Sequence, residues 1–373
     1  MKEINYGMVG CGMMGQEHLR NLAMIKGAHV SAIFEPDPGM RAQCRALVPE
    51  AVFVDSLGAL LARPELSALV ITSPNHCHAD QLLQIAATRP LPVLMEKPAC
   101  TNLEDVARLR ALSASHPAPL WTAMEYRYMP PIAAFIRQAR EPGVTGGNVM
   151  LSIREHRYPF LAKVGDWNRF ERYTGGTLVE KCCHFFDLMR HIVGRDPVRV
   201  FASGGQNHNH VDERYAEGQP DILDNAFVIV DFGHGQRAML DLCMFAEGSR
   251  YQEHICVVGP LGKVECFIPG PTRFWPQASL GPAPVAQLIV SPRAPQGPRT
   301  VEIPVDAALL AAGDHNGSTF YQHQGFYNAV AHGGPVEVSL DDGLKAVVIG
   351  LAAEHSAKTV EAVDLTRGAY ALA

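Results

Sequence analysis

The chain has 373 residues, of which 47% are apolar and 19% charged, and a net charge of −6 at pH 7. This length exceeds one ordinary core, so we expect two domains, 1–124 and 125–373. The acidic balance gives no reason to expect nucleic acid or an anionic membrane as a partner, and no apolar run is long enough to span a bilayer. The nine cysteines are scattered and form no CxxC motif, and the first residues show no export signal. We therefore expect reduced thiols in the cytoplasm.

The first third of the chain alternates strand patterns with helix patterns. Strands are predicted at 2–9, 28–35, 66–72, 92–95 and 120–124. Helices are predicted at 13–24, 79–87 and 101–113, the last opened by a capping box of Thr101 and Glu104. Strands that alternate with helices predict a parallel sheet covered on both faces.

The pattern changes after about residue 125. Runs of strand candidates predict an antiparallel sheet with a hairpin turn at 233–235; they lie at 148–156, 198–203, 226–232, 236–245, 252–258 and 262–268. Helices are predicted at 177–193, 320–332 and 341–360. Prolines are dense between 269 and 298, which predicts a long surface excursion rather than core.

A GxGxxG motif lies between the first strand and the first helix. Its glycines let the backbone approach a pyrophosphate, which then lies on the helix N-terminus. The predicted cofactor contacts are Gly10, Gly12, Met13, Met14 and Gly15. Glu35 ends the second strand, where a carboxylate accepts hydrogen bonds from the ribose and repels a 2′-phosphate. We therefore expect NAD, although Arg41, one helical turn further on, keeps NADP open.

Lys97 follows the predicted strand at 92–95 in the segment Glu96-Lys97-Pro98. The carboxyl ends of parallel strands face the ligand crevice, so this lysine is placed to meet a substrate. Its ammonium group can hydrogen-bond a substrate oxygen and stabilise a developing alkoxide. The plainer alternative is a surface lysine after a strand.

Glu180, His184 and Asp187 are spaced i, i+4 and i+7 on the predicted helix at 177–193, so they share one face. A histidine there can take a hydroxyl proton, because its pKa lies near working pH. The alternatives are a capping box of Thr177 and Glu180, a packed core histidine and a satisfied buried Asp187.

These segments, taken together and in this order, resemble the Gfo/Idh/MocA oxidoreductase family across nearly the whole chain. The resemblance rests on the GxGxxG start, Ser73-Pro74-Asn75-His76, Glu96-Lys97-Pro98, Tyr126-Arg127-Tyr128, the Gly-Gly helix with His184 and Asp187, Gln324-Gly325-Phe326 and Glu354-His355-Ser356-Ala357. It implies an α/β N-terminal Rossmann domain and a C-terminal α+β domain with a large, mostly antiparallel open sheet.

The resemblance also implies an NAD(P)-dependent enzyme acting on sugars, inositols or related compounds. Lys97 and His184 become the catalytic pair, with Glu180 beside them where many members carry aspartate. Further cofactor contacts are implied at Ser73, Pro74, Asn75, His78, Glu96 and Lys97. Substrate contacts are implied at Lys97, Tyr126, Arg127, Glu180 and His184.

A cationic segment precedes the helix at 177–193, and the resemblance implies that it lies near the substrate. Its candidate substrate contacts are Arg154, His156, Lys163, Trp167 and Arg169. These cations could clamp an anionic group, and Trp167 could stack on a sugar. The alternative is a solvated or oligomer-contact loop. No set of four His and Cys ligands has a known metal spacing, so we expect no metal site.

Three functions follow from these residues. The first is an NAD-dependent oxidoreductase acting on a hydroxyl of a sugar, sugar derivative or cyclic polyol. The second is an NAD-dependent glycosidase that works by transient oxidation, elimination, hydration and re-reduction, with an anionic glycoside as one substrate. The third is a non-catalytic sugar or dinucleotide sensor. An exposed sheet face would suit a homo-oligomer, a dimer or a tetramer.

Overall fold

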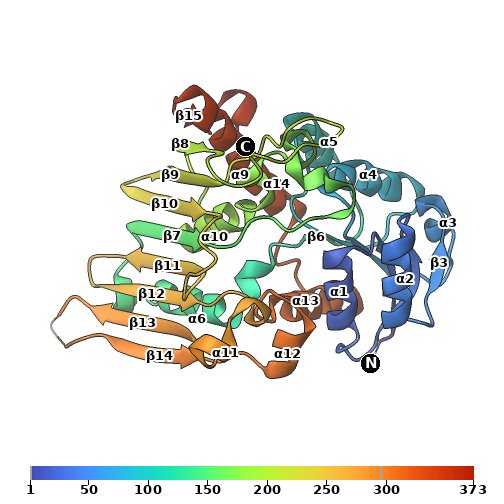
Figure 1. Cartoon of the computed structure of the whole chain (residues 1–373), viewed down its shortest axis with the longest axis horizontal. Coiled ribbons are helices and arrows are strands. Elements are labelled where there is room, and N and C mark those ends of the chain that lie inside the picture. The colour runs from blue at the N-terminus through green and yellow to red at the C-terminus, as the bar shows by residue number, and fades with distance from the viewer. Residues whose placement is uncertain (1, 295) are drawn as a thin grey trace.

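The computed structural model describes residues 2–294 and 296–373, so Met1 and Pro295 lie outside the described part. Two sheets organise the molecule, one in each half of the chain (Figure 1). The first has six parallel strands in the order β3-β2-β1-β4-β5-β6. They are β1 (Ile4–Val9), β2 (Ala28–Phe34), β3 (Val52–Val54), β4 (Ala68–Ile71), β5 (Val93–Met95) and β6 (Leu120–Thr122).

Helices connect these strands and cover the first sheet. They are α1 (Met13–Leu22), α2 (Pro38–Leu47), α3 (Leu57–Leu61), α4 (His78–Thr88) and α5 (Leu103–Ser113), with a 3₁₀ turn η1 (Asn75–Cys77) before α4. The chain leaves β1 toward one side of the sheet and returns to β4 on the other, so the strand order reverses between β1 and β4. Ligands of open parallel sheets bind beside the carboxyl ends of the strands at such a point.

The second sheet has nine strands in the order β14-β13-β12-β11-β7-β10-β9-β8-β15. All neighbouring pairs are antiparallel except β7 and β10. The strands are β7 (Met150–His156), β8 (Arg199–Gly205), β9 (Asn225–Gly233), β10 (Gln236–Cys243), β11 (Glu253–Val258), β12 (Gly262–Ile268), β13 (Ala286–Pro292), β14 (Arg299–Ile303) and β15 (Val363–Asp364). The predicted fold class is thus confirmed, including the hairpin between β9 and β10.

Helices of the second half pack against one face of this sheet and against the first domain (Figure 1). They are α6 (Pro130–Arg140), α7 (Pro142–Thr145), α8 (Glu171–Thr174), α9 (Thr177–Glu180), α10 (Cys183–Val193), α11 (Gln277–Leu280), α12 (Ala307–Ala312), α13 (Ser318–His332) and α14 (Leu340–Thr359). Short 3₁₀ turns are η2 (Glu125–Tyr128), η3 (Val164–Arg169), η4 (Thr272–Phe274) and η5 (Gly368–Tyr370). The helices α13 and α14 contact α1 and α5, so the end of the chain holds the two halves together.

Three local predictions are wrong. The helix α5 is capped by Asn102, whose side chain accepts from the Asp105 N–H, and not by a capping box of Thr101 and Glu104. The predicted helix at 177–193 is interrupted at Lys181 and Cys182, between α9 and α10. The segment rich in prolines is not all excursion, because β13 extends the second sheet within it.

The expectation of reduced thiols throughout is also wrong. Cys11, inside the GxGxxG motif, forms a disulfide with Cys44 on α2, 33 residues later. Side-chain packing of the glycine loop on α2 brings the two together, which spacing in the sequence does not reveal. The other cysteines are free thiols.

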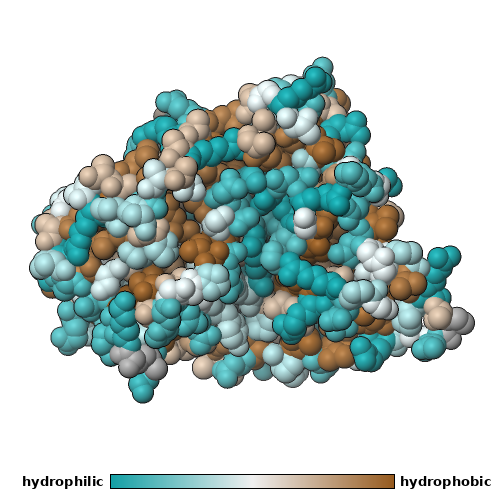
Figure 2. Space-filling view, turned by 180° about the vertical axis from the view of Figure 1, so that it is seen from behind, coloured by the Kyte–Doolittle hydropathy of each residue, from teal (hydrophilic) through white to brown (hydrophobic). Residues whose placement is uncertain are grey.

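No helix in the described part of the chain is long and apolar enough to cross a membrane. Hydrophilic side chains are gathered over the middle of the back of the molecule, with apolar ones scattered between them (Figure 2).

Candidate active site

A cavity of about 560 Å³ lies at the carboxyl ends of the parallel strands, where the strand order reverses. The segments after β1, β2, β4 and β5 form most of its wall, and the loop with η3 from the second half completes it. Many predicted residues line it: Gly10, Gly12, Met13, Met14, Glu35, Ser73, Pro74, Asn75, His78, Glu96, Lys97, Lys163 and Trp167. Both halves of the chain therefore build one binding space.

The glycine loop fits a dinucleotide. Gly10 has φ +84°, and a Cβ there would lie 2.7 Å from the backbone nitrogen of Ser73. Gly12 precedes α1 without any side-chain cap, so the first N–H groups of that helix are left for a ligand. A Cβ on Gly12 would meet no atom within 4 Å, although the residue lines the cavity. The residues present thus fit a pyrophosphate at the α1 N-terminus.

Glu35 lies at the end of β2 and braces this loop. One carboxylate oxygen accepts from the Cys11 N–H at 2.5 Å, and the other accepts from the Asp37 N–H at 2.8 Å. Arg41, which would favour a 2′-phosphate, is instead paired with Asp55 at 2.8 Å and lies over the Phe53 ring. The wall near Glu35 is therefore acidic, with the nearest arginine already engaged.

Lys97 follows β5 and lines the inner part of the cavity. Its Nζ donates to the carbonyl oxygen of Glu180 at 3.0 Å, which ties this loop to α9. Burial lowers the pKa of Lys97, but the acidic groups around it, Cys183 and Glu96 foremost, outweigh burial and leave the pKa raised. The side chain is therefore a cation at working pH.

His184 lies in the first turn of α10 and is only 2% exposed. Its ring stacks on the ring of Tyr126, with centroids 4.3 Å apart and planes 8° from parallel. Burial and the neighbouring cations, Lys97 first, hold the pKa of His184 well below its usual range. The imidazole is therefore neutral and can accept a proton.

Glu180 has a different role from the one its spacing suggested. One of its oxygens pairs with Lys163 Nζ at 3.2 Å, and Lys163 lies over the Trp167 ring. Thr177 donates to the Leu223 carbonyl oxygen, so no capping box of Thr177 and Glu180 forms. Lys163 and Trp167 line the cavity, whereas Glu180 and His184 are buried and are not among its lining residues.

Sequence reasoning missed Glu125, Lys181 and His315. Glu125 begins η2 shortly after β6, and its Oε1 lies 3.5 Å from His184 Nε2. Lys181 donates to the Tyr126 hydroxyl at 2.5 Å and pairs with Glu155 at 3.0 Å, both in the core. The position of Glu125 at a strand's carboxyl end was the signal that could have found it.

Besides Glu180 and His184, five predicted substrate contacts do not line the cavity: Tyr126, Arg127, Arg154, His156 and Arg169. Arg127 pairs with Asp187 through both carboxylate oxygens, at 2.5 and 2.6 Å, which makes Asp187 a satisfied buried carboxylate. Arg169 pairs with Glu213 at 2.9 Å. Arg154 and His156 lie on the opposite face of β7 from the buried Glu155, because side chains alternate along a strand. The expectation that Arg127, Arg154, His156 and Arg169 contact the substrate is therefore corrected.

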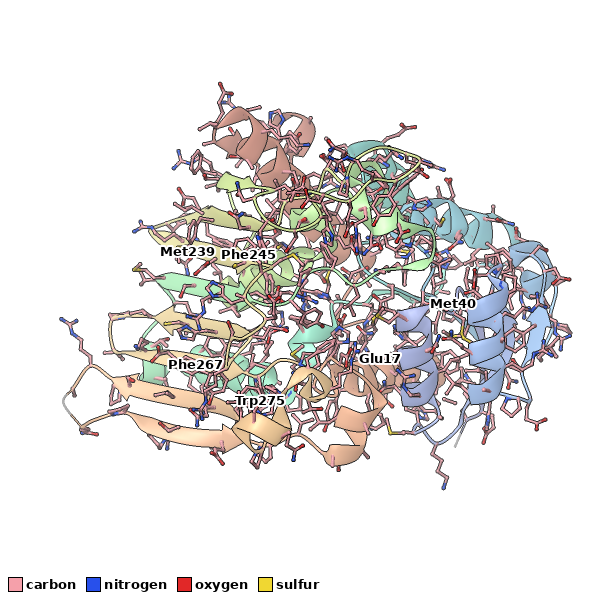
Figure 3. The ribbon with its side chains drawn as sticks, in the orientation of Figure 1. Glu17, Met40, Met239, Phe245, Phe267 and Trp275 are labelled. Carbon is pink, nitrogen blue, oxygen red and sulfur yellow. A yellow bond between two sulfur atoms is a disulfide. The ribbon has the colours of Figure 1, made fainter. Side chains whose placement is uncertain are left out.

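A buried polar network joins the two halves beside the cavity. Glu17 lies on α1 (Figure 3) and accepts from His315 at 2.8 Å and from Thr319 at 2.8 Å. Burial works against ionisation, but the adjacent His315 lowers the pKa of Glu17 to about 2, and Glu17 in turn raises the pKa of His315 to about 9. His18 lies between Glu96 and His323, at 2.7 Å from each. Residues of α1 and of the segment after β5 thus form one buried network of charged and polar groups with residues at and before α13.

Among residues 2–294 and 296–373, no group of three or more His, Cys, Asp or Glu side chains is arranged to hold a metal ion.

The parallel sheet, the glycine loop and the shared cavity define a two-domain oxidoreductase that binds a nicotinamide dinucleotide. A family model for the oxidoreductase family NAD-binding Rossmann fold matches residues 4–124, and one for the oxidoreductase family C-terminal alpha/beta domain matches residues 143–365. The chain belongs to the Gfo/Idh/MocA family of oxidoreductases, as its motifs predicted.

Three similar proteins each cover 70% or more of the chain. Myo-inositol 2-dehydrogenase of Thermotoga maritima is 25% identical over 96% of this chain and 98% of its own length. The 2,7-anhydro-N-acetylneuraminate hydratase of Escherichia coli is 24% identical over 70% of this chain and 67% of its own. A levoglucosan dehydrogenase solved with NADH and levoglucosan has the same fold, with a TM-score of 0.79 over 98% of this chain and 100% of that one, at 20% identity.

Proposed function

We propose that the protein oxidises a ring hydroxyl of a neutral sugar or cyclic polyol with NAD, and that Lys97 and His184 act at the reacting carbon. The observation that supports this is the place of Lys97. It lines the dinucleotide cavity and donates to the carbonyl oxygen of Glu180, four residues before His184. The names of relatives, an inositol dehydrogenase among them, support the substrate class.

Each residue has a separate role in the proposed reaction. Lys97, cationic in its buried setting, holds the substrate oxygen and stabilises negative charge on it. His184, neutral because of burial and nearby cations, accepts the hydroxyl proton. The dinucleotide, when bound, supplies the acceptor for the hydride. Glu180 neutralises Lys163 at the cavity wall and holds Lys97 through its backbone.

The charges near the cavity favour a neutral substrate. An anion clamp was one of two interpretations of the cationic segment at 154–172, but four of its cations each pair with a glutamate in the structure: Arg157, Lys163, Arg169 and Arg172. A paired cation must be separated from its carboxylate before it can bind an anion, which costs free energy. An anionic glycoside is therefore the less favoured substrate.

A redox-neutral reaction is the second candidate, because a hydratase of an anhydro-sugar is among the relatives. In that case oxidation, elimination, hydration and re-reduction follow one another, and the dinucleotide is regenerated. The test measures NADH absorbance and product together on inositols, anhydro-sugars and aryl glycosides. NADH that rises one-for-one with product supports the dehydrogenase. Product without net NADH, lost when NAD is stripped, supports the redox-neutral enzyme. The absence of turnover on every compound leaves the sensor.

NAD is the proposed cofactor rather than NADP, because Glu35 lines the cavity and Arg41 is engaged by Asp55. We expect Glu35→Gln to lower the ratio of kcat/KM for NAD to that for NADP by about tenfold or more, since it removes a charge that repels the 2′-phosphate. The amide oxygen can still accept from the Cys11 N–H. Glu65→Gln, at a distant exposed pair with Arg63, is the control. An unchanged ratio in Glu35→Gln would contradict the role.

A homo-oligomer is proposed through the outer face of the second sheet. Phe227, Ile229 and Met239 on β9 and β10 share this face and are 60%, 51% and 41% exposed, and Figure 3 places Met239 along the sheet. Arg154 and Asp241 lie opposite each other in register on the same face, and Asp241 pairs with His156 at 3.1 Å, so this face carries both signs of charge. We expect Ile229→Asp to lower the mass measured by light scattering to that of a monomer, with Asp364→Asn as a surface control. A monomeric wild type would refute this interface.

A cytoplasmic location stays a prediction. The cysteines outside the Cys11–Cys44 pair are free thiols, as a reducing compartment favours, whereas that pair is the exception.

A further inference from the structure

Glu125 is a buried carboxyl group beside His184. It begins η2, shortly after β6, and is 1% exposed. Its Oε1 lies 3.5 Å from His184 Nε2, and neither of its oxygens makes a hydrogen bond to any described residue. His184 Nδ1 likewise has no hydrogen-bond partner among the described residues. Buried polar groups are nearly always satisfied, so a carboxyl and an imidazole left open side by side point to a function.

The ring of His184 has a fixed orientation. Tyr126 stacks on it almost in parallel, and Lys181 holds the Tyr126 hydroxyl at 2.5 Å. Lys181 is itself anchored by Glu155. Because the ring is held in plane, Nε2 stays directed at Glu125 while Nδ1 stays open for another partner.

The titratable groups that face Glu125 come from several neighbouring elements. The charged ones are Glu96 and Lys97 after β5 and His315 before α13, and the neutral titratable ones are Cys183 and His184 on α10. Burial and the Glu96 carboxylate raise the pKa of Glu125 to about 7, against the opposing effect of His315 and Lys97. Glu125 therefore changes charge near neutral pH, while the pKa of His184 lies well below its usual range.

We propose that Glu125 is the residue that receives the proton from His184 when the substrate's hydroxyl is oxidised. This inference rests on the proposed function. A base with a strongly lowered pKa cannot keep the proton that it takes, so a second acceptor is needed in a buried site. Glu125 acts through His184 and is a positioning residue rather than a group that touches the substrate.

The step balances. The hydroxyl proton moves to Nδ1 of His184 as the hydride leaves the same ring carbon for NAD, which is the oxidant. The proton on Nε2 then moves to the Glu125 carboxylate. The products are a ring ketone, reduced dinucleotide, neutral His184 and protonated Glu125, which later returns its proton to solvent. Reduction of the ketone runs the same transfers in reverse.

The pH dependence follows with its sign. Below the Glu125 pKa of about 7 the carboxyl is protonated and cannot accept, so polyol oxidation is slow and rises as pH passes 7. Reduction of the ketone needs the protonated form, so its rate falls over the same interval. His315 is a cation that lowers the pKa of Glu125, and its removal must move both inflections to higher pH.

The first test compares Glu125→Gln with the matched variant Glu354→Gln. Glu354 is also buried with a raised pKa, about 8, but it accepts from the Leu178 N–H and does not contact His184. We expect Glu125→Gln to lower kcat for oxidation about 10²-fold and to lose the inflection near pH 7, with the dissociation constant for NAD unchanged. We expect Glu354→Gln to keep the inflection, and His315→Gln to shift it upward. A Glu125→Gln enzyme that keeps the wild-type pH profile overturns the proposal.

A second measurement does not depend on turnover. The ¹⁵N resonances of the His184 ring are followed against pH in the substrate-free protein, with assignment from a His184→Gln variant. We expect an inflection near pH 7 in the wild type that is absent from Glu125→Gln. If the wild type oxidises no polyol but the inflection is present, the proposed function fails and the proton coupling stands. If the inflection is absent or unchanged in the variant, the Glu125 proposal is overturned, whatever the activity.

Discussion

Replacement of Lys97 by methionine is expected to lower kcat for polyol oxidation by about 10²- to 10³-fold, the effect of removing one charged donor at a developing oxyanion. Methionine keeps the length and packing of the stem but removes the cation. The dissociation constant for NAD, measured by quenching of protein fluorescence, is expected to change by less than about threefold, because the glycine loop and Glu35 make most of the expected cofactor contacts.

Lys163→Met is the matched variant for this experiment. Lys163 lines the same cavity, but its charge is balanced by Glu180, and burial lowers the pKa of its ammonium group. We expect it to raise KM more than it lowers kcat, since its contacts are alike before and during the reaction. If Lys97→Met loses NAD affinity and kcat in equal measure, Lys97 is a cofactor contact only. If the two lysine variants behave alike, the special role of Lys97 is refuted.

The Lys97 variant also tests the electrostatics around the histidine. After burial, the Lys97 charge is the largest cause of the lowered pKa of His184. Loss of that charge must raise the pKa of His184, which shifts its ring resonances to a titration at higher pH. An unchanged His184 titration would show that the two groups lie farther apart in solution than the structure has them.

The alternation of strands and helices was enough to predict the first sheet and the location of the ligand site at the carboxyl ends of its strands. The segments that follow β1, β2, β4 and β5 were expected at the cavity and line it, from Gly10 to Glu96 and Lys97. The physical reason is that parallel strands end at one edge, so chain order alone gathers residues from distant positions. The same rule would have placed Glu125 beside them, since it follows β6.

Contacts between the two ends of the chain could not be predicted. Glu17 meets His315 across 298 positions, and His18 meets His323 across 305. Such pairs depend on how α13 packs against α1, and hydrophobic periodicity gives the face of a helix but not its partner. Those pairs help to set the charges of the buried groups beside the cavity, and these charges could therefore not be predicted from the sequence.

The strand β7 shows a second limit. Its position was predicted, yet its two faces were not told apart, and Arg154 and His156 were expected near the substrate. Leu151, Ile153 and Glu155 form the buried face of that strand, and Lys181 pairs with Glu155 inside the core. The buried face of a strand is normally recognised by apolar residues at every second position. A glutamate at one of these positions interrupts the pattern, so the buried face could not be recognised from the sequence.

Alanine at Gly10 and alanine at Gly12 are expected to abolish cofactor binding for different reasons. A Cβ on Gly10 would lie 2.7 to 2.9 Å from backbone atoms of Thr72 and Ser73, and the residue has φ +84°. Overpacking and a left-handed backbone each cost about 1–3 kcal/mol, so Gly10→Ala should lower the free energy of unfolding by about 2–6 kcal/mol. A Cβ on Gly12 meets no atom within 4 Å, and its φ is −69°.

Gly12→Ala should therefore leave the free energy of unfolding within about 1 kcal/mol of the wild type, the small effect of exchanging glycine at an N-cap. Both variants should lose NAD affinity by about 100-fold or more, because the added methyl on Gly12 projects into the space that a pyrophosphate needs at the α1 N-terminus. Urea unfolding and NAD titration separate the two effects. If Gly12→Ala binds NAD as the wild type does, the pyrophosphate does not approach this glycine. If both variants lose stability equally, the clash at Ser73 is not what sets Gly10 apart.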